Sequence, residues 1–312
     1  MSTSSNVPKI CMVGSSNIDL IARVPRLPGP GETLVGSLFQ IGYGGKGANQ
    51  AVMAARLGAQ VVAVTKVGRD VFGEDTLKNY RSQGIETTYV QFDETRFSGV
   101  APITVDEQTG QNSIVIVPGA NLGLSPADAH SASAAIQSAD VLICQFEILM
   151  ETTLEAFRIA KAGGKTLTIL NPAPAAAMPD ELFRMTDILA PNESETALLT
   201  GMPVDSIEQA AEAAEALHKR GPRIVIITLG QRGALLLEAD GTPQHIPAQS
   251  VQAVDSTGAG DAFVGSLAYF LALKRPVRDA VERAVAIATQ SVLKHGTQTS
   301  FPKRDEVLHL IG

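Results

Sequence analysis

The chain has 312 residues, with 25 basic and 32 acidic side chains, a net charge of −7 and two cysteines. This length allows one large α/β domain or two smaller ones, at roughly 150 residues per domain. The acidic balance, with no basic block, argues against a nucleic-acid or anionic-membrane surface. Apolar runs fall short of the ~20 residues that cross a bilayer, and residues 1–8 lack a secretory pattern. We therefore expect a cytoplasmic protein without a membrane partner, with nuclear presence allowed in a eukaryotic cell.

The first third of the chain mixes two patterns. Strands at residues 9–13 and 61–67, with helices near 47–56 and 72–83, predict an α/β arrangement. Strand-like pieces without helices between them lie at residues 19–24, 34–41, 98–105 and 112–117. These pieces predict a small, discontinuous antiparallel sheet beside the main sheet.

From residue 141 onward, short β-branched runs alternate with helical segments. The strands are predicted at residues 141–145, 166–171 and 224–229, and the helices near 151–162, 193–200 and 207–220. This alternation is typical of βαβ units around a parallel sheet. Two further helices are predicted at residues 261–273 and 277–295. Because no long linker divides the chain, we expect one domain over residues 1–312.

The two cysteines, Cys11 and Cys144, each lie inside an apolar run. Buried thiols in the reduced state fit this setting better than a disulfide framework or a metal site.

The first candidate motif is Gly42-Tyr43-Gly44-Gly45-Lys46-Gly47-Ala48-Asn49. Its GxGxxG spacing is a weak dinucleotide signal, because the motif does not follow the first strand and the strand at 61–67 ends in Lys66 instead of an acid. It also fails as a Walker A loop, since Gly47 follows the Gly-Lys pair. Glycines here would let the backbone approach a ligand, while Lys46 is either a ligand contact or a solvated helix-start residue.

The second motif is Asp255-Ser256-Thr257-Gly258-Ala259-Gly260-Asp261. Small residues that open a helix can turn their amides toward an anion, where the helix dipole also favours negative charge. Asp261 has two interpretations at this point, an N-terminal cap of the helix and a general base that takes a proton from a hydroxyl.

Three further features follow strand ends. In Asn192-Glu193-Ser194-Glu195, the carboxylates are either partners of the helix dipole or groups that orient a magnesium–phosphate unit. The segment from Thr228 to Gly233 fits a nucleotide contact and equally a plain hairpin turn. Asn17 and Asp19 are suited to binding vicinal hydroxyls.

Together these motifs resemble the ribokinase family of carbohydrate kinases (PfkB type) over nearly the whole chain, from Gly14 to about Pro302. The resemblance rests on Gly44 to Gly68, on Asp255 to Gly265, on Gln145-Phe146-Glu147 and on Gly296-Thr297-Gln298-Thr299-Ser300. It implies a three-layer α/β/α body with a central, mostly parallel sheet. It also implies that the small sheet, from about residues 17–41 and 96–118, is a lid that closes over the sugar and forms a homodimer interface.

The implied reaction is ATP-dependent phosphorylation of the 5-hydroxyl of D-ribose, with Asp261 as general base and an anion hole at Gly258, Ala259 and Gly260. The sugar would be held by Asn17, Ile18, Asp19, Gly45, Lys46, Gly47, Ala48, Asn49, Glu147 and Asp261. ATP would be held by Asn192, Thr228, Leu229, Gly230, Gln231, Arg232, Gly233, Gly260, Asp261 and Val285. Val285 departs from the family, whose members commonly carry Asn or His beside the adenine.

The implied ions are Mg²⁺ and K⁺. Glu195 would place Mg²⁺ through water. The K⁺ contacts would fall on Asp255, Thr257, Ser291, Lys294, Gly296 and Ser300.

Three other functions are compatible with parts of the sequence. One is phosphorylation of another sugar or nucleoside, such as deoxyribose, fructose or adenosine, because small differences in a pocket change preference sharply. Another is a catalytically silent sugar- or nucleotide-binding regulator, which has no need of the base at Asp261. The third, an NAD-linked oxidoreductase, is disfavoured by the misplaced GxGxxG.

Overall fold

The computed structural model describes residues 7–239 and 241–312. The strands of its larger sheet are β1 (Lys9–Val13), β4 (Gln60–Gly68), β5 (Glu86–Asp93), β8 (Val141–Cys144), β9 (Leu167–Leu170), β10 (Ile188–Leu189), β11 (Ile224–Thr228), β12 (Ala234–Glu238) and β13 (Gln244–Ile246). They lie in the order β13-β12-β11-β10-β9-β8-β1-β4-β5. All neighbours from β11 to β5 are parallel, whereas β12 is antiparallel to both β11 and β13. The predicted mostly parallel sheet is confirmed.

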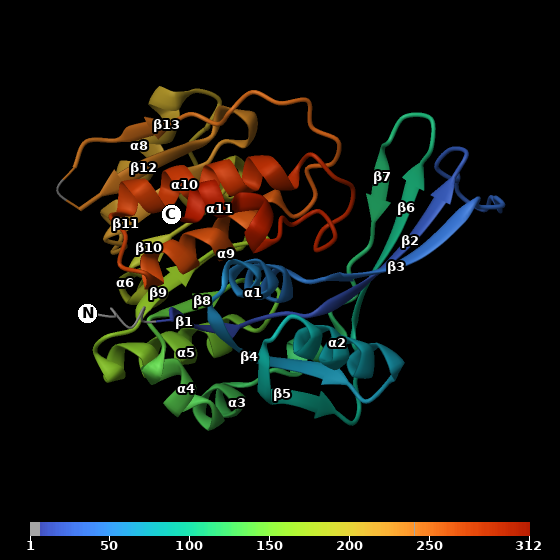
Figure 1. Ribbon diagram of the computed structural model, residues 1–312, viewed down its shortest axis with the longest axis horizontal. Helices are drawn as coiled ribbons and strands as arrows, with labels where there is room; N and C mark the ends of the chain where they lie inside the picture. The colour runs from blue at the N-terminus through green and yellow to red at the C-terminus, as the bar shows by residue number, and fades with distance from the viewer. Residues whose placement is uncertain (1–6, 240) are drawn as a thin grey trace.

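Helices cover both faces of this sheet, which gives the predicted three layers (Figure 1). One face carries α1 (Lys46–Leu57), α2 (Val71–Ser82), α9 (Ala259–Ala272), α10 (Val277–Ser291) and α11 (Leu308–Ile311). The other carries α3 (Pro126–Ser131), α4 (Ser133–Ser138), α5 (Met150–Gly163), α6 (Asp180–Met185), α7 (Glu193–Thr200) and α8 (Ile207–His218). Within the described ranges, no helix combines the length and apolarity needed to span a membrane.

The central strand β1 shows why the sequence favours this layering. Successive side chains of a strand point to opposite faces, so Ile10 and Met12 enter one apolar core while Cys11 and Val13 enter the other. Cys11 and Cys144 are fully buried free thiols, as predicted. Burial raises the pKa of the Cys11 thiol to about 12, so it stays protonated at neutral pH.

A second, smaller sheet projects from the body (Figure 1). Its strands are β2 (Asn17–Val24), β3 (Leu38–Gly44), β6 (Gly99–Asp106) and β7 (Asn112–Ile114), in the order β3-β2-β6-β7. The expectation of an antiparallel sheet was wrong for its central pair, because β2 and β6 run parallel. Both strands begin where the chain leaves the body, and both therefore run outward from it.

The predicted helix at residues 277–295 ends earlier, because α10 stops at Ser291. The carbonyl oxygen of Val292 accepts the amides of Val254 and Asp255, at 2.8 and 3.2 Å. Gly296 then turns the chain at a φ of 85°. Contacts with a distant segment thus end the helix and create a loop beside the start of α9.

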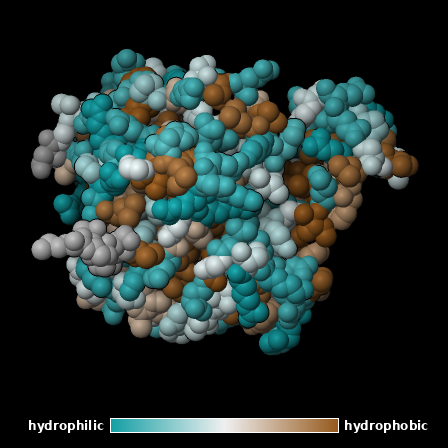
Figure 2. All heavy atoms as spheres, viewed as in Figure 1, coloured by the Kyte–Doolittle hydropathy of each residue, from teal (hydrophilic) through white to brown (hydrophobic). Residues whose placement is uncertain are grey.

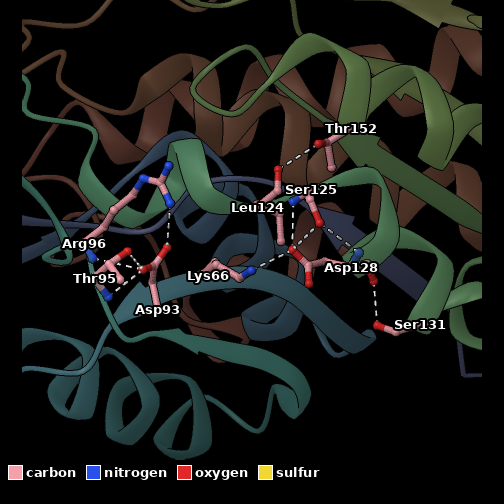
Figure 3. A network of polar contacts seen from close by, with 9 residues as sticks. All are labelled: Lys66, Asp93, Thr95, Arg96, Leu124, Ser125, Asp128, Ser131 and Thr152. Atoms are coloured by element: carbon pink, nitrogen blue, oxygen red, sulfur yellow. Dashed lines mark hydrogen bonds and ion pairs between the residues drawn. The ribbon is translucent and has the colours of Figure 1, made fainter.

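A polar network fixes the point from which β6 leaves the body (Figure 3). Lys66 of β4 forms an ion pair with Asp128 of α3, with 2.8 Å between Nζ and Oδ2. At the end of β5, Asp93 accepts the amides of Thr95 and Arg96, both at 2.9 Å. These contacts hold the segment that connects β5 of the larger sheet to β6 of the smaller sheet.

Candidate active site

A pocket of about 180 Å³ opens at the carboxyl ends of the parallel strands, where open α/β sheets commonly bind ligands. It is lined by Lys46, Asn171, Ala173, Ala190, Asn192, Glu195, Thr228, Gly258, Gly260, Asp261 and Val264. Residues from both predicted glycine motifs therefore meet in one cavity. Lys46 is half-buried in its wall, which favours a ligand contact over a solvated helix-start residue.

Asp261 lies in the first turn of α9 but does not cap it. The N-cap is Gly258, which lacks a side chain to form a cap hydrogen bond. Both carboxylate oxygens of Asp261 instead accept side-chain amides of α1, Oδ2 from Asn49 and Oδ1 from Gln50, each at 2.9 Å. Burial raises the pKa of Asp261, against the lowering effect of the Lys46 ammonium and the two amides. The cap interpretation was wrong, and a buried carboxylate is left facing the pocket.

The glycines at the start of α9 have different structural reasons. Gly258 has a φ of 80°, and a Cβ there would lie 2.6 Å from Cγ2 of Thr297, so only glycine fits. At Gly260 a Cβ would meet nothing within 4 Å, because this residue faces the open pocket. The Ala259 amide donates to the Ser256 carbonyl at 3.2 Å. First-turn amides of a helix lack acceptors within the helix, so this end favours an anion.

Carboxylates gather on the opposite side of Asp261, around the start of α1. Oε2 of Glu147 accepts the Lys46 amide at 2.9 Å, Oγ of Ser15 at 2.6 Å and Nδ2 of Asn17 at 3.5 Å. Asp19 on β2 belongs to the same group, since burial and the carboxylates of Glu147 and Asp261 raise its pKa to about 6. Polar acceptors and the Lys46 ammonium thus stand together beside Asp261.

Two glycines of the first motif allow this close arrangement. A Cβ on Gly44 would lie 2.4 Å from Oδ1 of Asp19. Gly45 has a φ of 87°, and its Cβ would lie 2.7 Å from the amide nitrogen of Asn17. Close approach to Asp19 and to the backbone at Asn17 is therefore the physical reason for these glycines, and the expected approach to a ligand stays a prediction.

Not every residue of the predicted sugar set can offer a side chain. Ile18 is fully buried and Ala48 is buried in the apolar core, so each can contribute only backbone. Gly47 packs against Ser15, whose amide nitrogen would lie 2.7 Å from an added Cβ.

Asn121 is a site residue that the sequence did not single out. Its Nδ2 donates to Oδ1 of Asn17 at 2.7 Å, and its Oδ1 accepts the amide of Ser16 at 2.9 Å. It therefore fixes which way the Asn17 amide faces. Its position 104 residues away in the chain gave no signal for this contact.

Of the predicted nucleotide residues, four line the pocket, namely Asn192, Thr228, Gly260 and Asp261, whereas Leu229, Gly230, Gln231, Arg232, Gly233 and Val285 do not. Asn192 and Glu195 form a reciprocal capping box at the start of α7, and Glu195 also borders the cavity. Burial raises the pKa of Glu195, against the hydrogen bond from the Asn192 amide and the Lys46 ammonium. Thr228 pairs with Asn192 in a β-bridge. The carboxylates of Glu193 and Glu195 lie in the first turn of α7, as the interpretation as partners of the helix dipole requires, and the role toward a magnesium–phosphate unit stays a prediction.

The turn after Thr228 connects the antiparallel strands β11 and β12, and it contains a 3-10 turn from Gly230 to Arg232. Arg232 is directed to Glu193 and to the carbonyls of Val204 and Asp205. The segment from Thr228 to Gly233 is therefore a hairpin turn whose first residue, Thr228, lines the pocket.

Val285, which was predicted to lie beside the adenine, is 7% exposed within α10 and belongs to the apolar core.

Three residues of the predicted K⁺ set meet beside the start of α9. The Asp255 carboxylate accepts the amides of Thr257 and Gly296, both at 2.9 Å. Ser291 and Ser300 lie in the same C-terminal segment, where their hydroxyls donate to the carbonyls of Ala288 and Thr297. The Lys294 ammonium is directed away, to Glu306 at 2.7 Å. A carboxylate with neighbouring backbone and hydroxyl oxygens is a donor set that suits a hard cation.

Comparisons with known proteins agree with this geometry. The family model described as pfkB family carbohydrate kinase matches residues 7–304. A ribokinase of Mus musculus is 44% identical over 302 residues, covering 96% of this chain and 93% of that protein. A deoxyribokinase of Salmonella typhi is 42% identical over 298 residues, covering 95% and 96%. The structure of an Arabidopsis thaliana ribokinase complexed with ribose and ATP superposes with a TM-score of 0.90 at 32% identity, covering 98% and 99%.

The crowding of carboxylates predicts a stability penalty at Asp19. Its pKa is about 6 in the folded protein but about 3.9 in an unfolded chain. Because the folded state holds the proton more tightly, ionisation of Asp19 lowers the free energy of unfolding as pH rises from about 4 through 6. We expect Asp19→Asn to stabilise the free protein at neutral pH by about 2 kcal/mol, measured by urea unfolding.

This gain should disappear below about pH 4, where Asp19 is protonated in both states. The exposed Asp305→Asn is the matched control, and it should leave the pH dependence unchanged. A stabilisation by Asp19→Asn that is equal at all pH values would contradict the explanation.

Proposed function

The chain belongs to the pfkB family of carbohydrate kinases, and we propose that it transfers the γ-phosphoryl group of ATP to the 5-hydroxyl of D-ribose. The products are D-ribose 5-phosphate and ADP. The observation that carries this proposal is the buried Asp261 carboxylate between a polar, hydroxyl-binding side and the amides of a helix start. The relative named ribokinase and the related structure that holds ribose and ATP support the choice of substrates. Because the reaction uses ATP, we expect it in the cytoplasm.

The sugar binds on the side of β2 and α1. Asn17, Asp19 and Glu147 offer acceptors and an amide at short range, which suits vicinal hydroxyls. Asn49 and the backbone around Gly45 complete this side, next to Asp261. The 5-hydroxyl then points toward the carboxylate of Asp261 and the start of α9.

Asp261 acts as the general base. Its carboxylate takes the proton of the 5-hydroxyl as that oxygen forms a bond to the γ-phosphorus, and the bond from γ-phosphorus to the β-phosphate oxygen breaks with its electrons going to ADP. The amides of Gly258, Ala259 and Gly260 would stabilise the negative charge on the transferring group, which requires the Ala259 amide to exchange the Ser256 carbonyl for a phosphoryl oxygen. Catalysis of this kind depends mainly on positioning and electrostatics.

The pocket is lined by two carboxylates, those of Glu195 and Asp261, and by the ammonium of Lys46, so cations are needed to hold a triphosphate. Glu195, at the pocket wall, would hold Mg²⁺ through water, and the ion would supply positive charge toward the phosphates. The oxygens around Asp255 fit K⁺, and they lie where α9 begins. Asn192 and the turn after Thr228 hold the nucleotide.

A second candidate substrate is 2-deoxy-D-ribose. The relative named deoxyribokinase is 42% identical over nearly the full chain, close to the value for the relative named ribokinase. The difference between the two sugars is one hydroxyl, which a polar site can discriminate strongly when its groups would be left unpaired.

We also propose a homodimer formed through the smaller sheet. Apolar side chains are exposed there, and Figure 2 shows hydrophobic residues gathered on this projection. They include Leu38, Phe39, Ile41, Ile114, Val115 and Ile116. Phe39 and Ile41 are 61% and 57% exposed. On β3, Gly42 pairs with Asp19 and shares its face of the sheet. Phe39 and Ile41 lie an odd number of residues from Gly42, so their side chains point to the opposite face. An exposed apolar surface of this kind marks an interaction site.

Sedimentation velocity should show a dimer for the wild type and a monomer for Phe39→Lys combined with Ile41→Lys. The two charges would have to be buried in the interface, which disfavours association. A wild-type protein that sediments as a monomer at all concentrations would exclude the dimer.

An ADP-release assay with D-ribose, 2-deoxy-D-ribose, D-fructose and adenosine tests the reaction. We expect the highest kcat/KM with D-ribose and a higher rate with K⁺ than without it. Highest kcat/KM with 2-deoxy-D-ribose would favour the second candidate. Binding of sugar and ATP without ADP release would identify a catalytically silent regulator instead.

Asp261→Asn tests the role of the base. We expect kcat to fall by roughly 10²–10⁴-fold, because a positioned general base contributes about that much. The Kd for D-ribose, measured by calorimetry, should change only a few-fold, since the amide keeps the size of the side chain. Asp305→Asn is the control. Near-normal turnover in Asp261→Asn would show that Asp261 is not the base.

A further inference from the structure

We propose that Gln50 is a positioning residue that holds the Asp261 carboxylate in the orientation and charge state needed to accept the sugar proton. This inference rests on the proposed function. Gln50 lies on α1, is fully buried, and contacts Asp261 without lining the pocket.

The direction of each hydrogen bond around Asp261 follows from its charge. An ionised carboxylate can only accept, so Asn49 and Gln50 must both turn their amide nitrogens toward it. The other N–H of Gln50 donates to Oδ1 of Asn171 at 3.1 Å, and Nδ2 of Asn171 donates to the Ala190 carbonyl at 2.9 Å. Both donors of the Gln50 amide are therefore used.

The carbonyl ends of the two amides are also fixed. Oε1 of Gln50 accepts Nε2 of Gln145 at 2.6 Å, and Oδ1 of Asn49 accepts Nε2 of Gln298 at 3.0 Å. A turned-over Gln50 would put its oxygen against Asp261 and its nitrogen against the Gln145 nitrogen. The donors and acceptors of these amides therefore fit together in one arrangement only, and the Asp261 carboxylate, which can only accept, determines it.

Gln145 shows that this direction has an energetic cost. Its Oε1 is buried without a hydrogen-bond partner among the described residues. A buried acceptor left unpaired costs about 1–3 kcal/mol. Gly14 leaves room for this oxygen, because a Cβ at Gly14 would lie 2.1 Å from it. The unpaired atom is explained if the amides are oriented to serve Asp261 and not to satisfy the core.

The charges around Asp261 explain why neutral donors are needed. The charged groups that face it are Lys46 of α1, Glu147 after β8, Asp19 of β2 and Glu195 of α7. Three of the four are carboxylates, which favour the protonated form of Asp261, as burial does. The Asn49 and Gln50 amides favour the ionised form without adding a charge that would bind the phosphates.

Gln50→Met tests this role, because methionine is close in size and lacks the amide. Loss of one hydrogen bond to the carboxylate should raise the pKa of Asp261. The acid limb of the pH profile of kcat/KM for D-ribose, at saturating ATP, should therefore move up by about one pH unit. The loss should be about tenfold on the acid side and should shrink at high pH. The control is Gln137→Met on α4, which removes an amide far from the site.

If Gln50→Met does not fold, Gln145→Met carries the test. It frees the Gln50 amide to turn over, so the limb should move in the same direction by a smaller amount. An unmoved limb in a folded variant, or an equal loss at every pH, would overturn the proposal. Failure of the proposed function would be seen separately, as a wild-type protein that releases no ADP with any sugar.

Discussion

The contact between α1 and α9 is the interaction on which the site depends. Gly265 allows the two helices to approach closely, since a Cβ there would lie 2.4 Å from the Gln50 carbonyl oxygen. One turn earlier on α9, Asp261 meets the side chains of Asn49 and Gln50. The start of α9 also carries Gly258 and Gly260, which line the pocket. Packing in the apolar core thus sets the distance between the start of α1 and the start of α9, which the proposed function assigns to sugar and phosphate, and the Asp261 carboxylate lies between them.

An acidic chain with a net charge of −7 does not suit a triphosphate by its overall charge. The positive potential is local instead, supplied by the start of α9 and by Lys46, to which the proposed function adds bound cations. Backbone amides supply this potential without side chains, so composition does not reveal it. In the proposed function, the carboxylates of Asp19 and Glu147 serve a neutral sugar, whose hydroxyls need acceptors. The two halves of that reaction would then occupy regions of opposite electrostatic character on either side of Asp261.

Sequence patterns predicted the alternating body, the projecting sheet and both glycine motifs because these depend on local periodicity and turn chemistry. They gave the helix at residues 277–295 a wrong end, because Val292 is held by a segment nearly 40 residues away. They also missed the parallel pairing of β2 with β6, which depends on where each strand leaves the body. Gln50, Asn121 and Asn171 were not singled out, since each acts through a partner more than 50 residues away. A buried amide carries no periodic signal, so only the fold shows what it contacts.

Asp19 connects the smaller sheet to the chemistry in the body. It lies on β2, and its pKa of about 6 reflects burial near Glu147 and Asp261 before any sugar is present. In the proposed function, hydroxyl donors of the sugar would stabilise the ionised form of Asp19, which lowers its pKa. Binding and ionisation are then linked, so the sugar binds more tightly where Asp19 has already lost its proton. The position of β2 relative to α1 sets how close Asp19 lies to Glu147 and Asp261, and so how strongly these carboxylates repel one another. Because the sugar would relieve this repulsion, the smaller sheet contributes directly to the free energy of sugar binding in the proposed function.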